Sequence, residues 1–352
     1  MAPDDFPAGG YWQDYVGFLF VWVAILAGTW VFFRGTRGRK GKLRLVAGNA
    51  LVLASIVWTL VVAGETYLRY VYDQTDAYGL TLTNWSWFSR HFHPNTDGFR
   101  DAEFTSAKRP GTTRVDCVGD SFTMGWGVKD PADCWPQRLD AALALKSPGR
   151  FQVRNFGVLG LTTKDEADIV DRIVTLGGTD HVILGYCLND PDDLLPPDTW
   201  FRREEQPHVP LIAPTTSFVA DFFWFRLKLA RDPRVAGYFD WEVRAYEDPV
   251  IFDQQKARFR RIADTCRRAS MRLDVVVFPM FSQWGETYGF DVCHERVTSA
   301  WKELGVNVID LRAAYRGIPG SDLAVNRFDG HPNELAHEIA AKTVLERAFG
   351  GR

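Results

Sequence analysis

The sequence predicts an α/β protein in which a three-layer, doubly wound sheet of five parallel strands follows a two-helix transmembrane hairpin. Two observations support this prediction. Two long uncharged runs stand near the amino terminus, and from Thr113 onward short apolar strands alternate with amphipathic helices. Such alternation is typical of a parallel sheet covered by helices on both faces. A chain of 352 residues has room for a membrane anchor and one sizeable domain.

The first expected element is a membrane anchor over residues 1–64. Residues 16–33 and 45–64 carry no charge, and each run can cross about 30 Å of hydrocarbon as a helix. Core helices seldom stay uncharged for so long. A cleaved signal peptide needs a positive flank, whereas Asp4 and Asp5 precede the first run. We therefore expect two membrane-spanning helices.

The loop between the two runs is basic and predicts the orientation of the chain. It has no acidic residue, and the positive-inside rule places such a loop in the cytoplasm. The part of the chain after the second run would then lie outside the cytoplasm, held at the inner or plasma membrane. A net charge of −3 gives no basic field for nucleic acid. The basic residues of the loop are Arg34, Arg37, Arg39, Lys40, Lys42 and Arg44.

Residues 65–112 are expected to connect the anchor to the next domain, as a helix over 65–72 and then as irregular chain. His91 and His93 lie there among aromatic residues, which is more typical of packed surface histidines than of metal ligands. The five cysteines show no CxxC spacing, so no disulfide framework is expected. No metal or other cofactor is predicted.

Residues 113–352 are expected to form the catalytic domain, and five strands suit a flavodoxin-type order. The expected strands are 114–118, 151–155, 181–186, 273–278 and 306–309. The expected helices are 135–145, 164–176, 252–269, 297–304 and 334–349.

An insertion over 191–250 interrupts this alternation. It is far longer than an ordinary connection and has an aromatic cluster between Phe218 and Leu227. Long insertions near strand ends are often lids or binding loops. The insertion either covers the active site, touches the bilayer, or is a helix packed on the sheet.

The first strand runs into Gly119, Asp120 and Ser121. This places a serine hydroxyl at the carboxyl end of a parallel strand, where doubly wound sheets bind ligands, and near the start of a helix. Alone the motif is weak, because glycine and aspartate also make ordinary capped turns.

Polar or glycine residues also follow the second and third strands. Gly160 and Asn189 stand in these turns. A glycine amide and an asparagine carboxamide can both donate hydrogen bonds to a tetrahedral oxyanion, although both residue types also favour turns.

A histidine follows the fifth strand on a segment expected to be a loop. His331 could accept the serine proton, and Asp329 could fix its tautomer. The alternative is a helix start capped by Asn333.

These segments together resemble the ordered blocks of the SGNH or GDSL hydrolase family: GDSFTMG, NFGVLGLTT, LND and DGHPN. The resemblance covers residues 95–349, and the lead-in from Asn95 to Arg100 is similar to that of membrane-anchored bacterial envelope polysaccharide O-acetyltransferases and esterases. The rival GxSxG pattern is absent. The resemblance implies that Ser121 is the nucleophile, with its own amide, the Gly160 amide and the Asn189 side chain as oxyanion donors. It also implies that His331 is the base and Asp329 its partner.

Two positions depart from the family pattern. Cys187 stands where the third block usually has glycine. Phe328 replaces the usual aspartate of the last block, which leaves a DxH spacing. If Asp329 pointed away from His331, Asp322 would be the substitute acid.

Three functions remain open. The chain could hydrolyse acyl esters of an extracytoplasmic glycan or lipid, with acetyl as the expected acyl group. It could instead pass the acyl group to a sugar hydroxyl, with a membrane-bound partner as acyl donor. It could also be a non-catalytic SGNH-fold binding or scaffold module of an acylation complex. No nucleic-acid partner is expected.

Overall fold

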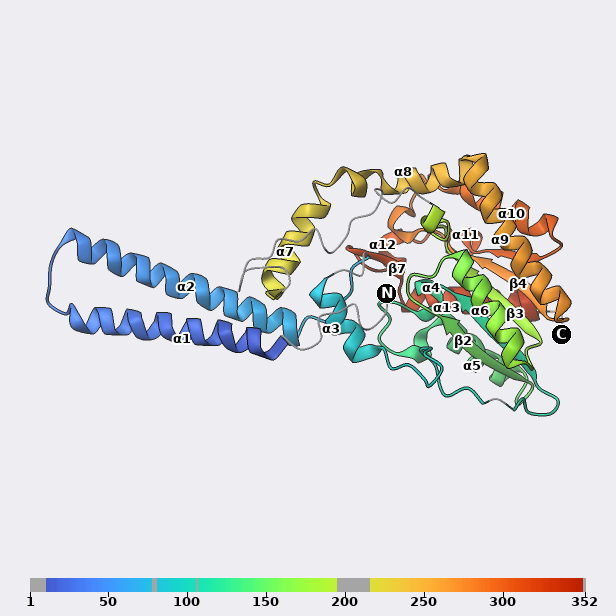
Figure 1. Ribbon diagram of the computed structural model, residues 1–352, viewed down its shortest axis with the longest axis horizontal. Helices are drawn as coiled ribbons and strands as arrows, with labels where there is room; N and C mark the ends of the chain where they lie inside the picture. The colour runs from blue at the N-terminus through green and yellow to red at the C-terminus, as the bar shows by residue number, and fades with distance from the viewer. Residues whose placement is uncertain (1–10, 78–80, 106, 195–215, 351–352) are drawn as a thin grey trace. The chain divides into compact units, whose positions relative to one another are not determined.

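The computed structural model describes residues 11–77, 81–105, 107–194 and 216–350 (Figure 1). By their contacts these residues form two compact units. The hairpin unit contains the described residues 11–74, 81–86 and 216–232. The sheet unit contains the described parts of 75–77, 87–194 and 233–350.

The sheet unit has five parallel strands in the order β2-β1-β3-β4-β5, which confirms the predicted fold class. Each strand agrees with its expected range to within two residues. The central strand β3 is buried at every residue, as expected for a strand covered by helices on both faces. The strands are β1 (Thr113–Gly119), β2 (Phe151–Gly157), β3 (His181–Tyr186), β4 (Arg272–Val277) and β5 (Asn307–Asp310).

Helices connect the strands and form the outer layers. The chain leaves β1 for the neighbour on one side and returns from β2 to the neighbour on the other side. Right-handed crossovers therefore place α5 and α6 on opposite faces of the sheet. α13 packs with α5, and α9 packs with α6. The long helices are α5 (Trp135–Lys146), α6 (Thr163–Leu176), α8 (Pro233–Glu247), α9 (Pro249–Arg268), α10 (Asp291–Glu303) and α13 (Glu334–Phe349).

Shorter elements surround the carboxyl ends of the strands. β6 (Ala324–Asn326) and β7 (Asp329–Pro332) form a small antiparallel sheet. The short helices are α3 (Leu82–His91), α4 (Ser121–Met124), α11 (Arg312–Tyr315) and α12 (Gly320–Leu323). The five cysteines are buried and unpaired.

The hairpin unit is built on α1 (Tyr11–Gly35) and α2 (Lys42–Tyr70), which lie side by side (Figure 1). Both helices are long and apolar enough to cross a membrane, and only 6% and 11% of their apolar windows are buried. A core helix would be mostly buried. Side-chain hydrogen bonds join the two helices, among them Trp22 Nε1 to Thr59 Oγ1 at 2.8 Å and Thr29 Oγ1 to Ser55 Oγ at 3.0 Å.

The structure differs from the sequence-based expectation in several places, of which the following bear on the site and on the anchor. Residues 82–91 form α3, where irregular chain was expected, and 329–332 form a strand instead of a loop. The helix α7 (Phe218–Leu229) belongs to the hairpin unit, whereas the expected boundaries placed it in the catalytic domain. Phe218, Val219 and Phe222 of α7 pack with Leu68 at the end of α2.

Candidate active site

Ser121 is held at the end of β1 by a short turn. Asp120 is the N-cap of α4, and its Oδ1 accepts a hydrogen bond from the Phe122 N–H at 2.9 Å. Ser121 is then the first residue of α4. The turn lies directly on the sheet, because a Cβ on Gly157 would stand 2.2 Å from the backbone nitrogen of Met124. Only glycine at the end of β2 permits this approach.

His331 lies on β7 and reaches Ser121. Its Nε2 is 2.8 Å from Ser121 Oγ. Its Nδ1 is 2.5 Å from Asp329 Oδ1. A carboxylate can only accept, so Nδ1 carries a proton and Nε2 is left to accept one from the serine hydroxyl. The Phe122 ring packs against the imidazole at 5.3 Å.

The Asp329 carboxylate contacts His331 because both residues lie on one strand. Residues i and i+2 of a strand point to the same face, so the DxH spacing brings the two side chains together. Thr75 Oγ1 and Trp126 Nε1 donate to the second oxygen, Oδ2, the latter at 3.1 Å. Asp329 is buried, whereas Asp322 lies exposed on α12.

Burial and neighbouring charges shift the pKa values of the ionisable side chains around Ser121. Burial alone would raise the pKa of Asp329, but the charge and hydrogen bonds of His331 outweigh it and the pKa is lowered. Burial would lower the pKa of His331, yet the charge of Asp329 raises it overall. Burial raises the pKa of Asp120 to about 6, although hydrogen bonds to Phe122 and Ser121 and the charge of His331 oppose this shift. Asp120 Oδ2 is 3.3 Å from Ser121 Oγ, so it also faces the hydroxyl.

Gly160 and Asn189 follow the two strands that flank β1. Gly160 stands in the turn after β2, and a Cβ built on it would meet nothing within 4 Å. Asn189 stands in the turn after β3, and its Oδ1 is buried without a hydrogen-bond partner among the described residues. Because β2 and β3 pair with β1 on either side, both turns lie at the sheet edge where Ser121 emerges.

A hydrogen-bond network that the sequence did not reveal holds the turn of Asn189. Tyr246 on α8 donates to the Leu188 carbonyl at 2.8 Å. Thr163 on α6 donates to Asp190 Oδ2 at 3.1 Å and accepts from Gln255 on α9 at 2.6 Å. Burial, together with nearby negative charges, raises the pKa of Asp190 well above its ordinary value. The turn is therefore anchored from three helices.

Cys187, the first departure from the family pattern, also lies beneath this turn. Its Sγ is buried at 3.8 Å from Met280 Sδ, and burial raises the pKa of the thiol. The side chain thus acts as a small apolar filler.

Arg100 has a structural role that explains the Asn95–Arg100 segment. It is buried and donates to the carbonyl oxygens of Gly125 at 2.8 Å and Val128 at 2.7 Å. Its Nε donates to the His91 carbonyl at 3.0 Å, and its guanidinium stacks on Trp87. Arg100 therefore fixes the loop that follows the Ser121 turn. His91 itself contributes a backbone group to this arrangement.

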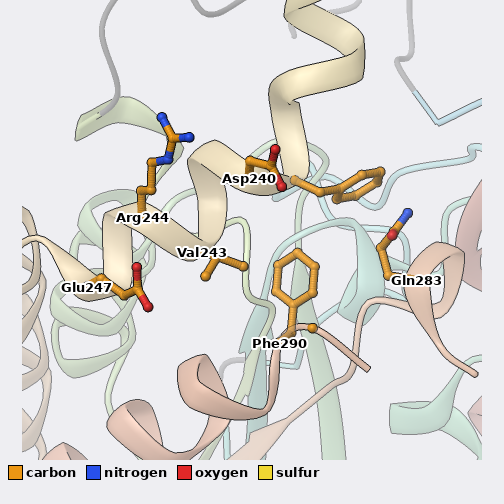
Figure 2. A pocket seen from close by; sticks show the side chains of 8 residues that line it. Asp240, Val243, Arg244, Glu247, Gln283 and Phe290 are labelled. Carbon is orange, nitrogen blue, oxygen red and sulfur yellow. The ribbon is translucent and has the colours of Figure 1, made fainter. Parts of the chain in front are cut away.

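A charged pocket of about 440 Å³ lies between α8 and the loop after β4. Figure 2 shows Asp240, Arg244 and Glu247 on α8 and Phe290 across from them. Its lining includes Gln283, which ends a short 3₁₀ turn whose Phe281 stacks on Phe122. None of Ser121, His331 and Asp329 lines this pocket.

Comparison with known proteins gives one family and several solved structures. The model of the GDSL-like lipase/acylhydrolase family matches residues 117–339. TesA is 12% identical, with 68% of this chain and 99% of that chain covered and a TM-score of 0.43. An acetylxylan esterase from Geobacillus stearothermophilus is 16% identical, with coverages of 69% and 97% and a TM-score of 0.43. A psychrotrophic esterase from Pseudoalteromonas sp. is 12% identical, with coverages of 68% and 98% and a TM-score of 0.42. No curated protein matches the sequence.

Proposed function

Because the chain belongs to the GDSL-like lipase/acylhydrolase family and is an SGNH-type ester hydrolase by family and fold, we propose that it works through an acyl-Ser121 intermediate. The observation that carries this proposal is the continuous series of contacts from the Ser121 hydroxyl through His331 to Asp329. This arrangement is the one that activates a serine nucleophile in acyl transfer.

In the first half of the reaction, Ser121 Oγ attacks the acyl carbonyl while its proton passes to His331 Nε2. Asp329 stabilises the imidazolium that forms. The tetrahedral intermediate collapses when the ester C–O bond breaks, and His331 gives its proton to the departing alkoxide oxygen. The alcohol leaves, and the acyl group stays on Ser121.

The oxyanion would be held by the amides of Ser121 and Gly160 and by the Asn189 side chain. The support is topological: these groups follow β1, β2 and β3, which are adjacent in the sheet. Donors of this kind are already oriented before the negative charge develops, so they stabilise it without reorganisation during the reaction. The network around Tyr246 and Thr163 would keep the Asn189 turn in place.

The second half of the reaction decides between hydrolase and O-acyltransferase. His331 removes a proton either from water or from a sugar hydroxyl, whose oxygen then attacks the acyl-serine carbonyl. The bond between the acyl carbon and Ser121 Oγ then breaks, and His331 returns the proton to that oxygen. A membrane-bound partner could supply the acyl donor in the second case. The remaining alternative, a non-catalytic scaffold module, has no need of a polarised hydroxyl aligned at 2.8 Å with an imidazole.

The substrate we propose is an acylated glycan or lipid outside the cytoplasm, with acetyl as the acyl group. A pocket of about 950 Å³ near the loops after β4 and β5 supports a glycan. Trp284 and Tyr288 offer ring surface for the C–H faces of sugars, while Arg316 offers donors for hydroxyl groups. Trp284 directly follows the short 3₁₀ turn Phe281–Gln283, whose Phe281 ring stacks on Phe122, the residue after Ser121.

The proposal is tested by labelling the full-length protein with a fluorophosphonate and by analysing products from p-nitrophenyl acetate with and without a sugar acceptor. We expect labelling at Ser121. Release of acetate alone would indicate a hydrolase, and acetylated sugar a transferase. A folded protein that neither reacts with the probe nor turns over ester would favour the scaffold alternative.

We also propose that α1 and α2 cross the inner or plasma membrane, with the basic loop in the cytoplasm and the sheet unit outside. The support is the pair of long apolar helices and the six basic residues between them. A phosphatase fused to the carboxyl end should be active, since this reporter works only outside the cytoplasm. Fluorescence from a cytoplasmic reporter at the same position, with an inactive phosphatase, would reverse the orientation.

A further inference from the structure

The helix α7 packs across the end of α2 within the hairpin unit. Its first turn meets α2 where the uncharged run ends: a Cβ on Gly64 would stand 2.8 Å from Val219 Cγ2. Phe218 shares a small buried cluster with Leu68. Figure 1 shows that α7 crosses the direction of α2 and does not extend it.

A buried ion pair fixes the amino end of α7 to α2. The side chains of Glu65 and Arg69 are almost completely buried, and Arg69 Nε is 2.8 Å from Glu65 Oε2. The Glu65 carboxylate accepts from the Val219 N–H at 3.0 Å, from the Phe218 N–H at 3.1 Å and from the Ser217 hydroxyl. Arg69 Nη2 donates to the Thr216 carbonyl at 2.6 Å.

This contact fixes the level of α7 along α2. A carboxylate at a helix amino terminus satisfies N–H groups that have no partner within the helix and interacts favourably with the helix dipole. Removing one member of a buried ion pair leaves the other charge uncompensated, so the contact resists separation. The amino end of α7 is therefore held at the carboxyl end of the apolar run of α2.

Large apolar side chains remain exposed at this level. Phe223 and Leu227 are 59% and 55% exposed, and their i,i+4 spacing places them on one face of α7. On α2, Tyr67 is 53% exposed and touches Tyr72, which in turn touches Phe222. Aromatic residues gather in this way where transmembrane helices leave the hydrocarbon.

We propose that α7 is an interfacial helix that inserts the side chains of Phe223 and Leu227 into the lipid surface where α2 leaves the membrane. The partner is the bilayer itself. This assignment rests on the proposed membrane anchoring, and it makes the anchor a three-helix element with two spans and one helix lying in the interface. Apolar faces of interfacial helices enter the boundary between headgroups and acyl chains.

The test uses the full-length protein with single added cysteines in lipid nanodiscs. Phe223→Cys and Leu227→Cys report on α7, Ile56→Cys on the proposed span, and Leu145→Cys on an exposed site of α5. Each cysteine carries an environment-sensitive nitrobenzoxadiazole dye. Nitroxide-labelled phosphatidylcholine and aqueous iodide serve as quenchers. Because the five native cysteines are buried, the unmodified protein is the control for background labelling.

We expect dyes at 223 and 227 to emit at shorter wavelength than the dye at 145 and to be quenched by a nitroxide near the headgroup end of the acyl chain. The dye at 56 should be quenched most strongly by a nitroxide near the methyl end. Lipid quenching at 56, together with iodide quenching alone at 223 and 227, would overturn the inference and leave the anchor intact. Quenching at 223 and 227 by neither the nitroxide lipids nor iodide, as expected if protein covered α7, would overturn the inference as well. Absence of lipid quenching at 56 would overturn the anchoring proposal itself, and the interfacial helix with it.

Discussion

Replacing Ser121 or His331 with alanine is expected to reduce ester turnover by about 10⁴-fold or more, leaving only what binding and the oxyanion donors supply. Ser121 forms the bond to the acyl group, and His331 Nε2, at 2.8 Å, lies closer to its hydroxyl than Asp120 Oδ2 at 3.3 Å. The measurement is kcat/KM for p-nitrophenyl acetate, together with fluorophosphonate labelling.

The double variant should lose little beyond either single one, because the two residues act as one unit. Asn189→Ala serves as a graded comparison: it removes an oxyanion donor but keeps the nucleophile, so a loss of about 10²- to 10³-fold with labelling retained is expected. Melting temperatures should be recorded for all variants. Ser121→Ala that is folded and fully active would end the acyl-serine proposal.

Replacing Asp329 with asparagine should both slow the reaction by about 10²- to 10⁴-fold and shift its pH dependence. His331 must be neutral to accept the serine proton, so kcat/KM rises with pH through the His331 pKa. The charge of Asp329 raises that pKa. Without this charge the pKa of His331 falls, and the acidic limb of the kcat/KM profile should move to lower pH while the plateau drops.

The shift of the acidic limb, in addition to the lower plateau, separates this role from a merely structural one. A variant that only loosened the fold would lower the plateau without moving the acidic limb. Asp322→Asn is the matched control, because Asp322 is exposed and the described contacts of its side chain do not include His331. Full activity in Asp329→Asn with loss in Asp322→Asn would transfer the orienting role to Asp322.

The sequence predicted those features that depend on local pattern. Short apolar segments and the amphipathic helices between them gave the sheet, and the residues after β1, β2 and β3 could be placed at one edge because parallel strands end together. The position of Ser121 at the end of β1 follows directly from this reasoning.

Features that depend on distant contacts could not be predicted. The four residues of β7 are too few to show an alternating pattern, so the strand carrying His331 was expected to be a loop. The donors to Asp329 lie far away in sequence, Thr75 by 254 residues and Trp126 by 203. The attachment of α7 to Glu65 likewise joins residues more than 150 positions apart. The residues around Asp329 and around Glu65 contain no local pattern that indicates these distant partners.

The position of Thr75 determines at which residue a soluble fragment of this protein should begin. Thr75 donates to the Asp329 carboxylate, its carbonyl accepts from Asn326 Nδ2 at 2.9 Å, and the Ala77 N–H donates to the Phe328 carbonyl at 3.0 Å. The segment 75–77 therefore belongs to the sheet unit although it follows α2 by only a few residues. A truncation at Thr113, where the sheet begins, would remove this segment and also Arg100, which fixes the loop after the Ser121 turn. A fragment that preserves the geometry of the triad must begin upstream of Thr75.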